Sequence, residues 1–406
     1  MQCGLLGEKL GHSYSPVIHG MLADYAYKLY EKAPDEVEDF IRNGAWDGLN
    51  VTIPYKKTVL PLCDELSPLA REIGSVNTLV RRADGTIYGE NTDAYGFEKM
   101  IAHCGMDVRG KKALVLGSGG ASVMAVAVLR ALGAGSVTVI SRHGEDNYEN
   151  LSRHADAQLI VNTTPVGMYP KNGEAAVDLT SFPACEGVLD VVYNPARTAL
   201  LLQAERLHIA HAGGLYMLVG QAKRASELFT GASIPDSEID RIEHTLSSSM
   251  QNIVLVGMPG CGKSTVGALL AEKLNHPLLE ADAQIEKAAG RTIPEIFAGS
   301  GEAGFREIET AVLRELGKSS GAVISTGGGC VTREENYALL HQNGLIVWLQ
   351  RDIGKLPKEG RPLSLTNDLR VMYEKRRPLY ERFADLVIDN NGAPAQTAEK
   401  ILEVLA

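Results

Sequence analysis

The stretch Gly257-Met258-Pro259-Gly260-Cys261-Gly262-Lys263-Ser264 directly follows the apolar run Ile253-Val254-Leu255-Val256 and decides the fold of the second half of the chain. A strand that runs into such a loop predicts a cradle for the phosphates of a nucleoside triphosphate. An earlier loop, Gly117-Ser118-Gly119-Gly120-Ala121-Ser122, follows the apolar run 113–116. Its form is typical of loops that hold the pyrophosphate of a dinucleotide. One polypeptide with both loops should therefore hold two active sites.

Size and composition set the class of protein. At 406 residues the chain is too long for one ordinary core, so two or three domains are expected. The net charge of −10 argues against a nucleic-acid surface. The six cysteines show no metal-type or redox-type spacing, which is typical of reduced thiols in a cytosol. With no signal-peptide pattern and no apolar run of membrane-spanning length, we expect a cytoplasmic protein.

The local pattern supports the first loop. Residues 111–140 give strand, glycine turn, helix and strand, as a dinucleotide-binding unit requires. We expect helices over 94–104, which could cross to another lobe, and over 216–231. Further short strands are expected at 159–161 and 187–192.

The second half begins after a short polar segment. The run Ser247-Ser248-Ser249 is typical of a linker, which we place at 247–250. Beyond it, apolar strand-like stretches alternate with helical ones, and this pattern predicts a parallel sheet with helices on both faces. The expected strands are 253–256, 323–325, 345–349 and 386–388.

The second glycine loop is the most specific signal in the chain. Backbone N–H groups around Gly257, Gly260 and Gly262, with those opening the following helix at Lys263 to Thr265, would hold phosphates. The Lys263 ammonium would contact the β- and γ-phosphates, and Ser264 would bind Mg²⁺. The alternative is a purely structural glycine turn, which the strand–loop–helix context disfavours.

Five later motifs narrow the substrate, and with the loop they resemble shikimate kinases over nearly all of residues 251–406: Asp282-Ala283-Gln284-Ile285-Glu286, Gly301-Glu302 with Phe305-Arg306 and Glu309, Thr326-Gly327-Gly328-Gly329, Arg361-Pro362-Leu363 and Arg376-Arg377-Pro378-Leu379-Tyr380. The resemblance implies that Asp282 meets the hydroxyl to be phosphorylated and acts as base. Arg306 and Arg376 would clamp a carboxylate, since a planar guanidinium matches that group. Gly328 and Gly329 would approach the substrate, and Arg361 would lie on a lid over ATP.

Two simpler interpretations stay open at this stage. Arg306 could pair only with Glu302 or Glu309 on one helix face. Asp282 could be an ordinary helix N-cap. The chain also departs from the resemblance, because Glu280 stands where such kinases usually have an aspartate. Glu280 keeps a carboxylate for the hydrated Mg²⁺, but its side chain is longer. The lid between Leu349 and Arg361 is several residues short, so reduced kinase activity is possible.

The first half resembles shikimate dehydrogenases from residue 3 to about 245. The resemblance is carried by His12-Ser13-Tyr14-Ser15-Pro16, Asn50-Val51-Thr52-Ile53-Pro54-Tyr55-Lys56, Ser75-Val76-Asn77-Thr78, Asn91-Thr92-Asp93 and Gly214-Leu215-Tyr216-Met217-Leu218-Val219-Gly220-Gln221. It implies substrate contacts from Ser13, Ser15, Thr52, Lys56, Asn77, Asp93 and Gln221, with Lys56 and Asp93 as the catalytic pair. Neutral donors and acceptors suit a triol carboxylate, and a lysine can protonate the alkoxide left by hydride transfer. The alternative is that Lys56 and Lys57 are ordinary exposed lysines.

The cofactor of the first half is predicted from the resemblance and from one arginine. Gly117, Gly119, Gly120, Ala121 and Gly214 would contact the dinucleotide. The second strand of the unit ends at Ser141-Arg142-His143, where an NAD enzyme usually places an acid. Arg142 can neutralise a 2′-phosphate, so NADP is preferred. Glu145 and Asp146 follow closely, and an acid at this place is typical of NAD enzymes, so the preference depends on Arg142. Only about twenty residues separate Arg142 from Asn162, where the dehydrogenases that this half resembles usually have nearly twice as many. The resemblance therefore implies a nucleotide sheet with one strand fewer than theirs.

The expectations combine into one architecture and one function. We expect an α/β chain: a two-lobed dehydrogenase with a Rossmann-like NADP lobe, then a P-loop kinase domain with a parallel sheet flanked by helices. The expected divisions are 1–104 plus 216–246 (substrate lobe), 105–215 (shortened NADP lobe), 247–250 (linker) and 251–406 (kinase).

The shared molecule would be shikimate: 3-dehydroshikimate is reduced with NADPH, and the product is phosphorylated with ATP and Mg²⁺. These small molecules, and neither nucleic acid nor membrane, are the expected partners, while the oligomeric state stays open. One alternative is a quinate/shikimate dehydrogenase with NAD. The other is a kinase half that is degenerate or regulatory.

Overall fold

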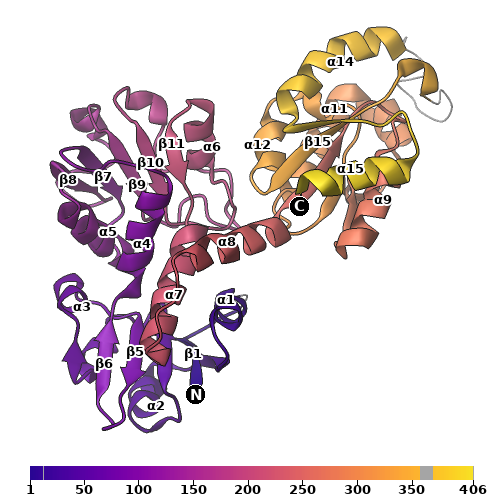
Figure 1. Cartoon of the computed structure of the whole chain (residues 1–406). Helices are drawn as coiled ribbons and strands as arrows, with labels where there is room; N and C mark the ends of the chain where they lie inside the picture. Colours follow the sequence, from indigo (N-terminus) through magenta and orange to yellow (C-terminus); the bar gives the residue numbers. More distant parts are fainter. Residues whose placement is uncertain (12, 357–368, 406) are drawn as a thin grey trace. The chain divides into compact units, whose positions relative to one another are not determined.

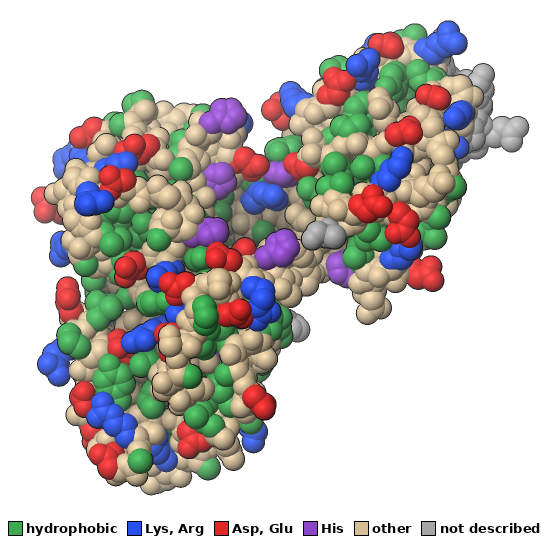
Figure 2. Space-filling model, viewed as in Figure 1, with side chains coloured by type: hydrophobic (Ala, Val, Ile, Leu, Met, Phe, Trp, Pro, Cys, Tyr) green, Lys and Arg blue, Asp and Glu red, His purple; other side chains and the backbone are tan. Residues whose placement is uncertain are grey.

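The chain folds into two compact units, and the computed structural model describes residues 1–11, 13–356 and 369–405 (Figure 1). One unit comprises Met1–Met168, Glu174–Asn194 and Leu200–Thr245, and the other comprises Tyr169–Gly173, Pro195–Ala199 and Leu246–Ala406. The α/β fold class predicted from the sequence is confirmed. Among the described residues, no helix has the length and apolar character needed to span a bilayer. Basic and acidic side chains are interspersed over the face seen in Figure 2.

The first unit begins with a mixed sheet. Its strand order is β2 (Ala26–Glu31), β1 (Gln2–Gly7), β3 (Gly48–Val51), β5 (Thr78–Arg81), β6 (Ile87–Glu90) and β4 (Glu65–Leu66). Strand β1 is parallel to β2 and β3, whereas β5 is antiparallel to β3 and β6. The accompanying helices are α1 (Ser15–Leu22), α2 (Val37–Asn43) and α3 (Pro68–Ile73). We call this part the mixed-sheet lobe.

A parallel sheet forms the other part of the first unit, which we call the parallel-sheet lobe. Its order is β11 (Ala210–Ala212), β10 (Gly187–Asp190), β9 (Leu159–Asn162), β7 (Lys112–Leu116) and β8 (Ser136–Ile140). The accompanying helices are α5 (Gly120–Ala131) and α6 (Ala199–Arg206). Between β8 and β9 the chain forms only a short 3₁₀ turn, Leu151–His154. The described sheet therefore has five strands, as the shortened sequence predicted.

Two long helices connect these lobes. Helix α4 (Thr92–His103) and helix α7 (Leu215–Thr230) pack along each other. They approach closely because glycines face each other where they cross: a Cβ on Gly220 would lie 3.1 Å from the Cα of Gly96. Helix α7 is followed by α8 (Ser237–Met250), which includes the residues 247–250 expected as a linker. Serine and threonine are accommodated there because Thr245 and Ser249 donate their hydroxyls to carbonyls one turn earlier.

The second unit has a parallel sheet with the order β13 (Leu278–Glu280), β14 (Val323–Ser325), β12 (Asn252–Val256), β15 (Gly344–Gln350) and β16 (Leu386–Asp389). All four ladders between these strands are parallel, as the sequence predicted. Its helices are α9 (Lys263–Leu274), α10 (Ala281–Ala289), α11 (Ile293–Leu316), α12 (Glu335–His341), α14 (Leu369–Phe383) and α15 (Pro394–Leu405). Helix α9 packs with α15, and α11 packs with α12 and α10.

The glycine contact between α4 and α7 yields a stability prediction. A Cβ at Gly96 would lie 2.3 Å from the Met217 carbonyl oxygen, so Gly96→Ala must separate the two helices. We expect a loss of about 1–3 kcal/mol in the free energy of unfolding. The measurement is urea unfolding followed by Trp46 fluorescence in a Trp348→Phe background, because these are the two tryptophans of the chain.

Gly20→Ala is the matched control. Gly20 lies in helix α1, and an added Cβ there would meet no atom within 4 Å. Because alanine favours a helix over glycine by roughly 1 kcal/mol, this change should leave stability equal or higher. Equal destabilisation by both substitutions would contradict the packing argument.

Candidate active sites

The first unit contains a cavity of about 230 Å³ that collects the predicted substrate residues. All seven line it: Ser13, Ser15, Thr52, Lys56, Asn77, Asp93 and Gln221. They come from loops of the mixed-sheet lobe and from the helices α1, α4 and α7. Gly214, predicted from its motif as a cofactor contact, lines the same cavity just before α7.

Lys56 and Asp93 form an ion pair inside this cavity. Lys56 Nζ lies 2.6 Å from Asp93 Oδ2, and the two side chains are 30% and 19% exposed. Lys57, in contrast, is exposed, so the interpretation of both lysines as surface groups fits only Lys57. Asp93 lies in the first turn of α4, where the helix dipole favours a carboxylate. The pair is thus a proton-bearing group beside an orienting acceptor.

A buried hydrogen-bond chain holds this ion pair from behind. Asn77 donates its amide to Asp93 Oδ1 at 2.9 Å and accepts the backbone N–H of Thr92 at 2.7 Å. The Thr78 hydroxyl lies 3.2 Å from the Asn77 amide oxygen and accepts from Asn50. Because each member is buried and bonded, the geometry of Asp93 is set before any ligand binds.

Several contributors to this site were missed from the sequence. Asn50 and Tyr193 line the cavity, and Tyr27 donates its hydroxyl to Asn50 at 2.8 Å. Tyr193 follows β10, and its place after a parallel strand was the available signal. Its ring meets that of Tyr14 edge-on, with centroids 6.1 Å apart, so the two lobes touch beside the cavity.

The predicted dinucleotide loop lies where the strand order of the parallel sheet reverses. Gly117 follows β7 with φ +104°, and a Cβ there would lie 3.0 Å from the Thr163 hydroxyl after β9. Gly119 is the N-cap of α5, so the N–H groups at Gly120 and Ala121 open the helix. This is the place where doubly wound sheets bind ligands.

The charged residues that follow β8 have different surroundings in the structure. Arg142 is exposed beyond the end of β8, whereas Asp146 Oδ1 lies 2.7 Å from His154 Nε2. His154 is the last residue of the short 3₁₀ turn between β8 and β9. One of the two nearby acids is therefore engaged with an imidazole rather than with Arg142.

The second unit contains a larger cavity, about 730 Å³, around its glycine loop. The predicted residues that line it are Gly260, Gly262, Lys263, Ser264, Thr265, Glu280, Asp282, Arg306, Gly328, Gly329 and Arg376. Gly257 begins the loop with φ +145°, and Gly260 and Gly262 also have positive φ, which only glycine adopts freely. Lys263 Nζ donates to the loop carbonyls of Gly257 and Met258 at 2.9 and 3.2 Å.

Arg306 and the buried Glu309 lie side by side in the lining of this cavity. Arg306 pairs with Glu309 at 2.6 Å and with Glu302 at 3.1 Å, so the helix-face pairing considered above does exist. Glu309 is fully buried and was not assigned a role from sequence, although it lies one turn after Arg306. Burial raises the pKa of the Glu309 carboxyl, while the Arg306 guanidinium opposes this shift. Within the described residues, Arg306 Nε and Glu309 Oε1 have no hydrogen-bond partner.

The glycine run after β14 fits between these groups. A Cβ on Gly329 would lie 2.0 Å from Arg306 Nη2, and one on Gly328 would lie 2.5 Å from the ring of Pro259. Arg376, on α14, donates to the Gly328 carbonyl at 3.1 Å. Glu280, not Asp282, is at the N-cap position of α10, and Asp282 lies in its first turn. The N-cap interpretation of Asp282 is therefore wrong.

The residues predicted to bind Mg²⁺ and ATP have different positions relative to this cavity. Ser264, at the start of α9, and Glu280, at the end of β13, both line it. Arg351 also lines a neighbouring cavity of about 430 Å³ with Arg370 and Tyr373. Arg361, predicted on the lid, lies outside the described residues.

These sites define a dinucleotide-type lobe with a polar substrate cavity, followed by a P-loop phosphotransferase domain. Family models agree: "Shikimate dehydrogenase substrate binding domain" matches residues 5–79, and "Shikimate kinase" matches residues 259–406.

Individual relatives extend the match over the first unit. A shikimate dehydrogenase (NADP(+)) of Clostridium perfringens is 35% identical over 264 residues, which cover 60% of this chain and 97% of the relative. A chorismate mutase/shikimate 5-dehydrogenase fusion protein from Clostridium acetobutylicum has a TM-score of 0.58 at 36% identity, covering 60% of this chain and 96% of that one. A quinate dehydrogenase from Corynebacterium glutamicum in complex with NAD has a TM-score of 0.56 at 27% identity, with coverage of 61% and 99%.

The chain belongs to the shikimate dehydrogenase family and carries a shikimate kinase domain after the dehydrogenase. The resemblance to both families is confirmed, and the matches support a bifunctional enzyme of the shikimate pathway.

The hydrogen-bond chain behind Asp93 yields the next prediction. Asn77 is 3% exposed, so Asn77→Ala leaves the Thr92 N–H and one Asp93 oxygen without their partner. We expect a loss of roughly 2–4 kcal/mol in unfolding free energy, because buried polar groups lose their hydrogen bonds. The measurement is again urea unfolding followed by Trp46 fluorescence.

Asn43→Ala serves as the control for this change. The Asn43 amide bonds Asp39 on the exposed face of α2, where water can replace it. Its effect should stay within about 0.5 kcal/mol. An Asn77→Ala variant as stable as Asn43→Ala would show that the buried chain does not hold the site.

Proposed function

We propose that the first unit reduces 3-dehydroshikimate to shikimate with NADPH, and that the second unit phosphorylates the 3-hydroxyl of shikimate with ATP. The observation that carries the proposal is the convergence of seven predicted polar residues on one cavity around the Lys56–Asp93 pair. Such a set offers donors and acceptors for several hydroxyls and a carboxylate. The two reactions are consecutive, since the product of the first is the substrate of the second.

Lys56 is proposed as the proton donor in the reduction. NADPH, when bound, supplies the hydride that converts the ketone to an alkoxide. The ammonium at Lys56 Nζ transfers a proton to that oxygen, and Asp93 keeps the ammonium aimed into the cavity. Asn77 in turn orients Asp93, while Ser13, Ser15, Thr52 and Gln221 bind the remaining polar groups of the substrate.

The residues of the parallel-sheet lobe fit a dinucleotide. A Cβ at Gly119 or Gly120 would meet no protein atom within 4 Å, so both positions leave space for a pyrophosphate beside the N–H groups that open helix α5. We propose that the exposed Arg142 binds the 2′-phosphate of NADP.

The kinase proposal uses the same kind of argument. Asp282 accepts the proton of the attacking hydroxyl, and Arg306 and Arg376 bind the substrate carboxylate. Gly328 and Gly329 leave room for close approach, and Lys263 with the loop N–H groups neutralises the phosphates.

We propose positions for the metal and the nucleoside from the same cavity. Mg²⁺, when bound, offsets phosphate charge, and oxygen ligands from Ser264 and Glu280 suit its chemistry. The cavity beside Arg351 offers space for the nucleoside of ATP. Arg361 is proposed from sequence alone as a further contact to ATP.

These roles imply a domain division. We propose residues 1–104 with 216–246 as the substrate lobe, 105–215 as the NADP lobe, 247–250 as a helical connection and 251–406 as the kinase domain.

Quinate oxidation with NAD is the second candidate for the first unit. The similarity to the quinate dehydrogenase of Corynebacterium glutamicum favours it, since the same fold serves that enzyme. Arg142 argues for NADP, and Ser15, which is buried and lines the substrate cavity, argues for shikimate. Steady-state rates with shikimate and quinate, each with NADP and NAD, decide between them.

Single-site variants should separate the two activities. Lys56→Ala should lower dehydrogenase turnover by roughly 10²–10⁴-fold, because it removes the proton donor. Asp282→Asn should lower kinase turnover by a similar factor. Each variant should retain the other activity, as measured by NADPH absorbance and by release of ADP. A comparable loss of both activities in either variant would refute the assignment of two independent sites.

A coupled assay tests the whole proposal. Incubating the chain with 3-dehydroshikimate, NADPH and Mg·ATP should produce shikimate 3-phosphate, detected by mass spectrometry. Lys263→Ala should stop the sequence at shikimate, because the phosphates lose their principal cation. Two outcomes would overturn the proposal for the second unit. One is undiminished phosphorylation by Lys263→Ala. The other is no phosphorylation by the unsubstituted chain, as expected of a degenerate kinase half.

A further inference from the structure

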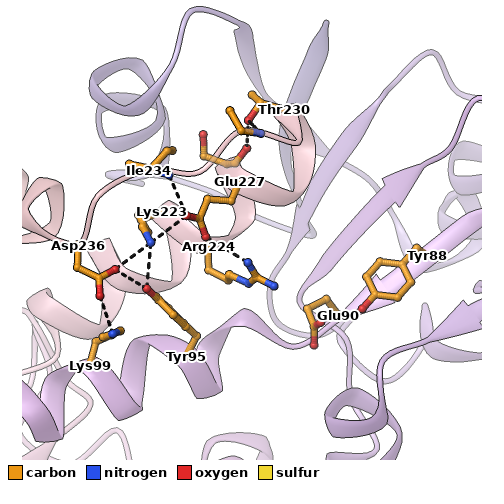
Figure 3. Close-up of polar contacts among 12 residues, drawn as sticks. Tyr88, Glu90, Tyr95, Lys99, Lys223, Arg224, Glu227, Thr230, Ile234 and Asp236 are labelled. Atoms are coloured by element: carbon orange, nitrogen blue, oxygen red, sulfur yellow. Dashed lines mark hydrogen bonds and ion pairs between the residues drawn. The ribbon is translucent and has the colours of Figure 1, made fainter.

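A lysine that is not among the residues lining the substrate cavity is buried in the first unit. Lys223, on α7, is 4% exposed. Its Nζ lies 2.9 Å from Glu227 Oε1, 2.9 Å from Asp236 Oδ1 and 3.0 Å from the Tyr95 hydroxyl oxygen. Tyr95 in turn donates its hydroxyl to Asp236 Oδ1 at 2.7 Å. Figure 3 shows the ammonium between these three groups.

The cluster joins three separate segments. Lys223 and Glu227 belong to α7, Tyr95 belongs to α4, and Asp236 lies in the turn before α8. Lys99, also on α4, donates to the second oxygen of Asp236 at 2.6 Å. The lysine therefore connects α7 both to the helix that it crosses and to the turn that follows it.

These contacts lie within two residues of the active-site cavity. Tyr95 comes two positions after Asp93 on α4, and Lys223 comes two positions after Gln221 on α7. Between the two helices, the glycine contact at Gly96 brings the backbones together but supplies no side chain to resist sliding. A directional polar contact next to that crossing can fix the register of the helices.

The charges favour a permanently formed cluster. Burial acts to lower the pKa of Lys223, but its bonds to Tyr95, Asp236 and Glu227 outweigh burial and hold that pKa above its ordinary value. The bonds from Lys99, Tyr95 and Lys223 hold the pKa of Asp236 below its ordinary value. Lys223 thus stays cationic and Asp236 stays anionic near neutral pH.

We propose that Lys223, acting through Tyr95 and Asp236, is a positioning residue that holds Asp93 and Gln221 in the relative placement needed for turnover. The inference rests on the proposed dehydrogenase function and deepens it. A shift of about 1 Å between α4 and α7 would misplace the proton-donating pair against the substrate, and misplacements of this size can cost up to about 10²-fold in rate.

The neighbouring Arg224 provides a matched control. It is adjacent in sequence, carries the same charge and contacts the same Glu227, at 3.2 Å. Its side chain is 41% exposed, and the contact stays within α7. Both Lys223→Met and Arg224→Met remove one positive charge, but only Lys223→Met removes a connection between helices. Comparing the two variants therefore separates the effect of that connection from the effect of the charge.

The experiment measures steady-state reduction of 3-dehydroshikimate in folded protein, well below the unfolding temperature of each variant. Lys223→Met should lower kcat about tenfold and raise KM for 3-dehydroshikimate about fivefold, since Asp93 and Gln221 both shift. In Lys223→Met, KM for NADPH should change by less than about twofold. In Arg224→Met, kcat and KM for 3-dehydroshikimate should also change by less than about twofold. Tyr95→Phe, which removes only the bridging hydroxyl, should change kcat and KM in the same directions by about threefold.

Amide hydrogen exchange of the unliganded chain supplies a readout that does not depend on activity. Lys223→Met should accelerate exchange in α4 and α7, and Arg224→Met should not. Lower thermal stability of Lys223→Met with unchanged kcat and substrate KM would overturn the proposal, because a purely structural role predicts that result. If Lys223→Met does not fold, Tyr95→Phe decides by the same criterion. Lack of reduction by the unsubstituted chain would instead refute the proposed function, and the exchange comparison would still test the positioning role.

Discussion

Both glycine loops depend on the N–H groups at the start of a helix that directly follows a parallel strand. The first four N–H groups of a helix lack partners within it, so the turn that enters the helix must offer them to something outside. In the first unit, β7 passes through Gly117 into α5, and in the second, β12 passes through Gly257 and Gly262 into α9. Side chains that approach these turns come from the carboxyl ends of neighbouring strands, where parallel sheets gather their ligands.

This constraint explains why the first unit tolerates its shortened sheet. The segment between β8 and β9 forms only a short 3₁₀ turn, and β7, its glycine turn and β9 lie at the reversal of strand order. The remaining turn positions His154 against Asp146 and leaves Arg142 exposed. The shortening therefore alters the part of the lobe proposed to meet the adenosine end of the cofactor, and leaves the pyrophosphate turn intact.

Much of the fold could be predicted because strands and glycine turns leave local signals. The expected strand 323–325 has the observed bounds, and the helix expected over 216–231 differs by one residue at each end. The serine run was expected as a linker because serine is common in flexible segments. In the structure helix α8 continues to Met250, and the Ser249 hydroxyl donates to the Leu246 carbonyl of the preceding turn.

The site could be predicted only where a motif marks it. Motif residues such as Lys56, Asp93 and Asn77 lie together in one cavity, as expected. Tyr27 and Glu309 were not assigned a role from any motif. Each takes its position because buried polar groups must find hydrogen-bond partners. The same holds for Lys223, which reads as one more surface lysine on an amphipathic helix.

The sequence by itself determined that the chain has two units with glycine loops, which motif residues would gather around each cavity and that one sheet would be short. Those conclusions depend on residue type and spacing, which are local. Tertiary structure alone decided which buried groups hold the reactive ones, such as Asn50 behind Asn77 and Lys223 between α4 and α7. These contacts join residues far apart in the chain, and they exist because packing forces polar atoms with no access to water to bond one another.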